Sequence, residues 1–367
     1  MITTTGAVVD GPGAPFTIQE ITVDAPRAGE VLVRMVAAGL CHTDLTVRAG
    51  GIPFPLPGVL GHEGAGVIEQ IGPGVTKVAP GDKVLLTFTS CAHCAACRAG
   101  HPAYCDTWLP RNLIGGARDD GSATLFRGGD PIGGRFFGQS SFARHALADE
   151  RSVIRVDADA PLEMLAPLGC GVQTGFGAVW NVLCPTPGST LVVFGAGAVG
   201  LSAVMAAAQL PLSAIIAVDR VPTRLDLALE LGATHVVDVS TADTGKAVMD
   251  ITGDRGTDYA IDTTGNPSVL RTAVDTLSIR GACAVVGAPP AGTEVALDVQ
   301  GLLVGKTIIG VTLGDGEPGT LLPQLVDLHR RGRLPLHRLV RHYPPEELET
   351  AAADMHQGAT IKPVIRF

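Results

Sequence analysis

Hydrophobic and polar positions are arranged in two different ways along the 367-residue chain. Up to about residue 170, short apolar segments of strand length are separated by turns rich in Gly and Pro, as at 30–39, 64–72 and 82–89. This density of short strands predicts a barrel-like or mostly antiparallel domain. From about Val172, apolar strands alternate with segments of helical length, which predicts a doubly wound parallel sheet. The last residues predict a helix near 345–357 and a final strand over 361–367.

One apolar segment could be mistaken for a membrane span. From Thr190 to Val218 the chain has no charged residue, which is long enough to cross a bilayer. However, three glycines in its first half and Pro211 in its second half divide it into a strand, a turn, a helix and another strand. This is the pattern of a buried parallel sheet, so we expect no membrane span and no membrane partner.

Composition and charge narrow the classes of partner. The chain has 27 Lys and Arg against 36 Asp and Glu, a net charge of −9, so we do not expect it to bind nucleic acid. An apolar content of 46% excludes intrinsic disorder. The first residues lack a basic stretch followed by an apolar one, so we expect a cytoplasmic location. In such a chain, eight cysteines favour metal ligation over disulfides.

The most specific motif is a run of four cysteines within fifteen residues: Cys91, Cys94, Cys97 and Cys105. Four thiolates at this spacing can close a tetrahedral shell around one Zn²⁺ and leave no position open to water, which is typical of a structural site. The repeated two-residue gap argues against a chance group of buried thiols. His93 and His101 lie nearby, but the four cysteines already fill the shell.

A second set of metal-ligating residues is dispersed along the chain: Cys41, His62 and Cys170. Two thiolates and one imidazole form a ligand set of catalytic zinc, with the fourth position open to water or substrate. Asp44 could accept a hydrogen bond from the ligating imidazole, and Glu63 could approach the metal. Spacing alone leaves open whether these residues converge.

A third motif, Gly195-Ala-Gly197-Ala-Val-Gly200, follows an apolar strand and begins a helix of small residues. In this context the glycines predict a dinucleotide site, with the pyrophosphate at the start of the helix. Asp219 ends the next strand, where a carboxylate would bind a ribose hydroxyl and repel a 2′-phosphate. NAD is therefore favoured over NADP, although the neighbouring Arg220 and Arg224 weaken this preference.

Together and in this order, the three motifs resemble those of the zinc-dependent alcohol dehydrogenases of the medium-chain dehydrogenase/reductase superfamily. The resemblance covers essentially the whole chain, and segments 41–66, 136–143 and 167–175 look closest to bacterial aryl-alcohol dehydrogenases. It implies an α/β protein with a GroES-like, mostly-β catalytic domain over 1–171 and 313–367. Residues 172–312 would then form a Rossmann domain.

The resemblance also implies a role for individual residues, with two zinc ions and one NAD per subunit. Cys41, His62 and Cys170 match the catalytic zinc ligands, with Glu63 as an occasional extra ligand, and Thr43 matches the hydroxyl that passes the substrate proton to the cofactor ribose. Further positions match residues that contact the cofactor: His42, Thr174, Gly195, Gly197, Val199, Gly200, Asp219, Arg224, Val286 and Lys362. The substrate pocket would be lined by Ile52, Phe88 and Ala288. The family's habit predicts a homodimer or homotetramer joined through the cofactor domains.

Two positions depart from the family's usual pattern. Thr46 stands where many relatives have a histidine that ends the proton relay, so the proton must leave through water or another base. His42 stands where the family usually has arginine, so we expect a weaker, pH-dependent phosphate contact and faster release of the coenzyme.

These features predict the interconversion of a primary aryl alcohol and its aldehyde. The small Ala288 leaves room for a ring, and no group of cations is evident to hold a substrate carboxylate. An allylic terpenoid alcohol such as geraniol is the near alternative, and a thiol-adduct formaldehyde dehydrogenase is another. A zinc-free reductase would lack the Cys41, His62 and Cys170 set, and a non-enzymatic binding protein would not need an open zinc site.

Overall fold

The computed structural model describes residues 1–367, which form two compact units: Met1–Cys170 with Glu317–Phe367, and Gly171–Gly316. The sequence places the second boundary four residues earlier, at 312/313. Residues 313–316 stay with the second unit, where the Asn181 side-chain amide donates to the Gly314 carbonyl at 3.0 Å. We describe the two units separately and call them the metal unit and the sheet unit.

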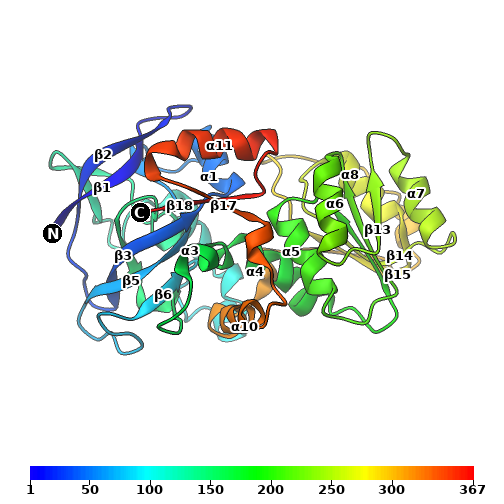
Figure 1. Ribbon diagram of the computed structural model, residues 1–367, viewed down its shortest axis with the longest axis horizontal. Coiled ribbons are helices and arrows are strands. Elements are labelled where there is room, and N and C mark those ends of the chain that lie inside the picture. Colours follow the sequence, from blue (N-terminus) through cyan, green and yellow to red (C-terminus); the bar gives the residue numbers. More distant parts are fainter. The chain divides into compact units, whose positions relative to one another are not determined.

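The metal unit is built from two mostly antiparallel sheets, as the pattern of short strands predicts (Figure 1). One sheet contains, in spatial order, β4 (Gly58–Val59), β1 (Ile2–Val9), β2 (Phe16–Val23), β7 (Leu125–Arg127) and β8 (Asp130–Ile132). The other contains β10 (Val153–Arg155), β6 (Lys83–Leu86), β5 (Glu63–Ile71), β3 (Glu30–Gly39), β18 (Lys362–Arg366) and β17 (Val340–Tyr343), with β9 (His145–Asp149) paired to β3.

The interior of the second sheet explains why these strands form. Alternate residues of β3, Val31, Val33 and Met35, are buried and pack with Ile68 of β5 and Leu86 of β6. Leu32 between them is buried as well, so this part of β3 is covered on both faces of the sheet. The predicted final strand is β18, which pairs antiparallel with β3 and parallel with β17.

Five helices accompany the sheets of this unit, and one of them begins directly after Cys41. They are α1 (His42–Arg48), α2 (Ala95–Arg98), α3 (Leu162–Leu165), α10 (Pro318–Arg330) and α11 (Leu348–Gln357). The helix predicted near 345–357 is therefore present, and a 3₁₀ turn over Pro345–Glu347 precedes it. Cys41 caps the start of α1.

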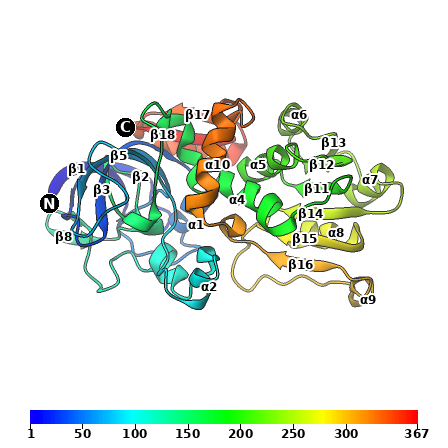
Figure 2. The same cartoon turned by 90° about the horizontal axis from the view of Figure 1, so that it is seen from below.

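The sheet unit contains one fully parallel six-stranded sheet (Figure 2). Its spatial order is β13 (His235–Asp238), β12 (Ala214–Asp219), β11 (Thr190–Phe194), β14 (Thr257–Asp262), β15 (Leu277–Val285) and β16 (Thr307–Gly310). The helices are α4 (Gly171–Gly177), α5 (Ala198–Ala207), α6 (Pro222–Glu230), α7 (Thr244–Ile251), α8 (Pro267–Asp275) and α9 (Val299–Leu302). This strand order is the doubly wound Rossmann arrangement, so the predicted fold class is confirmed.

The uncharged segment from Thr190 to Val218 forms β11, a turn, α5 and most of β12. Its strands lie in the middle of the sheet, where side chains on both faces are buried. No helix among residues 1–367 is long and apolar enough to span a bilayer.

Candidate functional site

The four closely spaced cysteines converge at one point around α2. The Sγ atoms of Cys91, Cys94, Cys97 and Cys105 all lie within 4.8 Å of one another. Backbone N–H groups point at the sulfurs, since Cys91 N donates to Cys105 Sγ at 3.2 Å and Cys94 N donates to Cys91 Sγ at 3.3 Å. Burial raises the pKa of Cys105, but hydrogen bonds from Thr107 and from Cys91 N outweigh it and lower that pKa to about 6. Burial and a hydrogen bond with Cys94 raise the pKa of Cys97 to about 12, so without a metal the cluster favours the thiolate, the form that binds zinc, at Cys105 and not at Cys97.

The dispersed residues also converge, which spacing alone leaves open. Ligand atoms of Cys41, His62, Glu63 and Cys170 all lie within 4.8 Å of one another. Cys41 precedes α1, His62 directly precedes β5, Glu63 is the first residue of β5, and Cys170 follows a turn over Ala166–Gly169. The last three of these residues are buried. The metal unit alone therefore supplies all four ligand atoms.

The imidazole of His62 is oriented by Asp44, as the sequence suggests. His62 Nδ1 lies 3.2 Å from Asp44 Oδ1, and both side chains are fully buried. The Asp44 carboxylate is itself fixed because it accepts hydrogen bonds from Cys41 N at 2.9 Å and Gly61 N at 3.0 Å. Burial lowers the pKa of His62, but the charges and hydrogen bonds of Asp44 and Cys41 together outweigh burial and raise that pKa to about 10.

The residues present fit a zinc ion. His62 Nε2 is buried and has no hydrogen-bond partner in the protein, although a buried imidazole nitrogen normally has one. It shares its surroundings with two thiols and a carboxylate. Two cysteines and one histidine are a donor set that tetrahedral zinc accepts, and the metal would satisfy the unpaired nitrogen.

A buried lysine accompanies this second cluster. Lys362 Nζ, on β18, donates to Glu63 Oε1 at 2.9 Å, to Glu63 Oε2 at 3.0 Å and to the Leu40 carbonyl at 3.1 Å. Burial lowers the pKa of Lys362, but Glu63 outweighs it and raises that pKa. The predicted role of Lys362 as a pyrophosphate contact stays a prediction, since its ammonium group lies against Glu63 here.

Residues 135–142, which we call the clasp, enclose His62 from its other sides. The ring of Phe137 stacks on the imidazole with centroids 4.3 Å apart, and Phe136 meets its edge at 5.4 Å. The Gln139 amide donates to the His62 carbonyl at 2.9 Å and accepts from Gly64 N at 3.0 Å. The sequence analysis did not predict that Phe136, Phe137 and Gln139 pack around His62. The only indication that this segment matters was the resemblance of residues 136–143 to the family.

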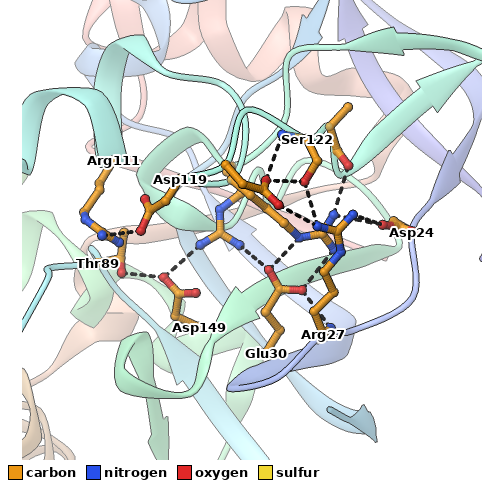
Figure 3. Close-up of polar contacts among 12 residues, drawn as sticks. Asp24, Arg27, Glu30, Thr89, Arg111, Asp119, Ser122 and Asp149 are labelled. Carbon is orange, nitrogen blue, oxygen red and sulfur yellow. Dashed lines mark hydrogen bonds and ion pairs between the residues drawn. The ribbon is translucent and has the colours of Figure 1, made fainter. Parts of the chain in front are cut away.

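Arginine–carboxylate contacts fasten the segment that leads into the clasp (Figure 3). Glu30 accepts from Arg118 Nε at 2.8 Å and from Arg135 Nη1 at 3.1 Å. Asp149 lies 2.8 Å from Arg135 Nη2 and accepts from Thr89 Oγ1 at 2.7 Å. All five residues come from the metal unit, and the two arginines are largely buried.

The glycine motif of the sheet unit has the geometry of a phosphate-binding turn. Gly195 has φ +93°, and a Cβ at Gly200 would lie 1.7 Å from the Gly195 carbonyl oxygen, so neither position accepts a larger residue without a shift. A Cβ at Gly197 would meet nothing within 4 Å, because the start of α5 faces open space there. Asp219 Oδ2 accepts from Ala196 N at 2.6 Å and ties the end of β12 to this turn.

The remaining predicted residues are divided between the units. Thr43, the second residue of α1, has its Oγ1 3.8 Å from Cys41 Sγ, and Thr46 Oγ1 donates to the His42 carbonyl at 3.0 Å. Ile52 and Phe88 belong to the metal unit. The sheet unit carries the others: Thr174 in α4, Val199 in α5, Arg224 in α6, and Val286 and Ala288 after β15.

Two family models match the chain. The alcohol dehydrogenase GroES-like domain matches residues 27–158, and the zinc-binding dehydrogenase model matches residues 198–328.

Similar proteins match over the whole length. The chain is 40% identical to a geraniol dehydrogenase of Castellaniella defragrans, with 100% of this chain and 98% of that protein covered. A solved structure of benzyl alcohol dehydrogenase from Acinetobacter calcoaceticus is 47% identical, with a TM-score of 0.96 and full coverage of both chains. An alcohol dehydrogenase zinc-binding domain protein from Burkholderia ambifaria is 53% identical, with a TM-score of 0.97 and coverage of 100% and 99%.

Proposed function

The chain belongs to the zinc-binding alcohol dehydrogenases, and we propose that it interconverts a primary aryl alcohol of the benzyl type and its aldehyde with NAD. The observation that carries the proposal is the largely buried cluster of Cys41, His62, Glu63 and Cys170 with the unpaired His62 Nε2. Such a cluster serves an open zinc site and has no evident use in a protein that only binds a partner.

In this proposal Cys41, His62 and Cys170 hold the catalytic zinc, and Cys91, Cys94, Cys97 and Cys105 hold a structural zinc. Bound zinc supplies the Lewis acidity that lowers the pKa of an alcohol hydroxyl. The Thr43 hydroxyl, next to Cys41, accepts the proton of the substrate hydroxyl and passes its own proton to the cofactor ribose. Asp44 holds the imidazole so that Nε2 faces the thiols.

The sheet unit would hold NAD, which supplies the acceptor for the hydride. Gly197 leaves room for the pyrophosphate at the start of α5, where free N–H groups favour an anion, and Gly195 and Gly200 allow the tight turn that precedes it. The Asp219 carboxylate favours a free ribose hydroxyl over a 2′-phosphate. Five further residues would contact the cofactor: His42, Thr174, Val199, Arg224 and Val286. Lys362 would contact the pyrophosphate only if its ion pair with Glu63 were broken.

The relay beyond the ribose differs from that of relatives with a histidine at position 46. The Thr46 hydroxyl donates to a carbonyl of its own helix, so this side chain already has a local partner. We therefore assign the last step of proton release to water.

Substrate choice rests on Ile52, Phe88 and Ala288, which would line an apolar pocket that accepts a ring. The 47% identical benzyl alcohol dehydrogenase supports an aryl substrate. A second candidate is an allylic terpenoid alcohol, which the 40% identical geraniol dehydrogenase supports.

The test is NADH formation with benzyl, cinnamyl, geranyl and short aliphatic alcohols, with NADP in parallel. We expect the highest kcat/KM with benzyl alcohol and NAD. Higher kcat/KM with geraniol would favour the second candidate, and formaldehyde oxidation that requires a thiol would favour a thiol-adduct enzyme. Absence of activity with every alcohol would contradict the proposal.

We also propose that the protein is a homo-oligomer joined through its sheet units. β16 forms an edge of the parallel sheet, and exposed apolar side chains gather on it and on the neighbouring segments: Ile279, Val299, Leu303, Val304 and Ile308. An apolar edge strand is a surface that proteins normally cover. Light scattering should give at least a dimer for the native protein and a smaller particle for Ile308→Lys.

A further inference from the structure

The clasp holds a backbone conformation that its residues do not favour by themselves. Arg135, Phe137 and Ser140 have φ of +61°, +50° and +52°, in the left-handed region where a Cβ crowds the backbone. Three such residues within six positions persist only where the surroundings fix them. The bonds that fix the clasp therefore determine where its side chains lie.

One end of the clasp is fixed by the guanidinium of Arg135. This side chain is 8% exposed, and it reaches Glu30 at 3.1 Å and Asp149 at 2.8 Å. Both carboxylates are also bound from elsewhere, Glu30 by Arg118 and Asp149 by Thr89. The anchor of Arg135 is therefore a rigid buried network.

The other end is fixed by Ser140. Its hydroxyl donates to the Val59 carbonyl at 2.7 Å and accepts from Phe136 N at 2.9 Å. Phe137 lies between the two anchors and is 4% exposed. Its ring can therefore move little against His62.

The stacked ring limits a motion that Asp44 alone would allow. A single hydrogen bond at Nδ1 fixes one atom of the imidazole, whereas the ring plane can still tilt about that bond. Phe137 lies nearly parallel to the imidazole, at 21°, and Phe136 stands almost perpendicular to it, at 88°. Together with Asp44 these rings determine where Nε2 points.

We propose that Arg135 is a positioning residue for the catalytic metal: through the clasp it presses Phe137 against His62 and so fixes the direction of Nε2. The inference rests on the proposed function, because it takes His62 as a ligand of the catalytic zinc. Arg135 itself stays out of contact with the metal and the substrate. Substitution of a residue that orients a metal ligand typically lowers metal affinity or activity by about 10- to 100-fold.

The test uses the full-length enzyme loaded with Co²⁺, whose visible spectrum reports the ligand geometry. The variants are Arg135→Gln, Phe137→Leu and the double variant, with Arg127→Gln as the matched control. Arg127 lies in the same part of the chain and forms a partly exposed ion pair with Asp10. The spectrum of Cys41→Ser, which retains the four-cysteine cluster, is subtracted to isolate the His62 site.

Each single variant should shift the cobalt spectrum of the His62 site and weaken its metal affinity by about 10-fold or more. The four-cysteine cluster should keep its metal, and kcat should fall while the dissociation constant of NADH stays unchanged. If Arg135 acts through Phe137, the double variant should resemble Phe137→Leu rather than combine both losses. Arg127→Gln should match the native protein.

An unchanged spectrum and affinity in Arg135→Gln would overturn the inference, as would fully additive losses or equal weakening of both metal clusters. If Arg135→Gln does not fold, Phe137→Leu decides, because it keeps an apolar side chain and removes only the stacked ring. A native protein that bound no cobalt at His62 would instead overturn the proposed metal centre, and the inference with it.

Discussion

The two metal-ligating clusters of this protein have the same number of candidate ligands and differ in almost everything else. The four cysteines come from fifteen consecutive residues, and two of them are partly exposed. Cys41, His62, Glu63 and Cys170 come from three distant segments, and only Cys41 is partly exposed. The first cluster is held by local backbone turns, whereas the second depends on the whole metal unit.

Under the proposed function, this difference separates a site that would serve the fold from one that would serve a reaction. A local all-cysteine shell leaves no coordination position open and mainly adds stability. The dispersed cluster combines thiols, an imidazole and a carboxylate with a buried lysine. With three protein ligands, a bound zinc would keep one position at which water and substrate could exchange. The geometry of this cluster then depends on contacts from distant parts of the chain: Asp44, the clasp and β18.

The largest effect should follow from Cys41→Ser in the dispersed cluster. Turnover should fall by at least about 1,000-fold, because the reaction loses its Lewis acid. NADH binding should stay nearly intact because the glycine motif lies in the sheet unit. Steady-state kinetics and fluorescence titration measure the two quantities, with the exposed Cys184→Ser as the control. Retained activity would refute a catalytic metal at Cys41.

The next largest effect should follow from Cys97→Ser in the four-cysteine cluster. Zinc content should fall from about two to one per chain. The free energy of unfolding should drop by about 4 kcal/mol, since metal binding contributes directly to folding. Freshly prepared protein should still turn over. Metal analysis and thermal unfolding check this, and loss of both metals at once would show that the clusters are not independent.

An effect of similar size, but limited to metal-depleted protein, is expected for Lys362→Met, which leaves Glu63 buried without its ammonium partner. Breaking a buried ion pair costs about 3–5 kcal/mol, and this cost should appear in metal-depleted protein. With zinc bound, the cation replaces part of the lost charge and the cost should shrink. Urea unfolding with and without zinc measures both values, and exposed Lys246→Met serves as the control. Equal costs in the two states would contradict this account.

The smallest effect is expected for His93→Gln beside the four cysteines. His93 Nδ1 lies 2.8 Å from the Cys91 carbonyl, and the four sulfurs gather without it. Zinc content should be unchanged and stability should shift by no more than about 0.5 kcal/mol. Metal analysis after dialysis against a chelator tests this. Lost zinc would mean that the cluster uses an imidazole after all, and the contrast with the His62 site would weaken.

The sequence could predict what depends on neighbouring residues. The four-cysteine spacing, the glycine turn and the alternation of strands and helices are local, and the structure confirms the fold that they predict. Asp44 lies three residues from Cys41, so its contact with the His62 site could be anticipated.

What the sequence could not predict depends on packing between distant segments. In the sequence, Arg118 and Arg135 look like ordinary loop residues. In the structure both donate hydrogen bonds to Glu30, which lies 88 and 105 positions earlier in the chain, respectively. The stack of Phe137 on His62 likewise requires a left-handed backbone at a non-glycine residue, which no propensity favours. These contacts give Arg118, Arg135 and Phe137 a structural role within the segment 106–138, to which the sequence alone assigns none.

The position of β18 also has a consequence for the order of folding on the ribosome. This strand lies between β3 and β17 and carries Lys362, which meets Glu63 299 positions earlier in the chain. The sheet unit is continuous, so it can fold as soon as residues 171–316 have emerged. The metal unit can complete its fold only after the segment 317–367 has been synthesised, long after Cys41 and His62 have left the ribosome. During that interval its thiols are open to oxidation and to the wrong metal.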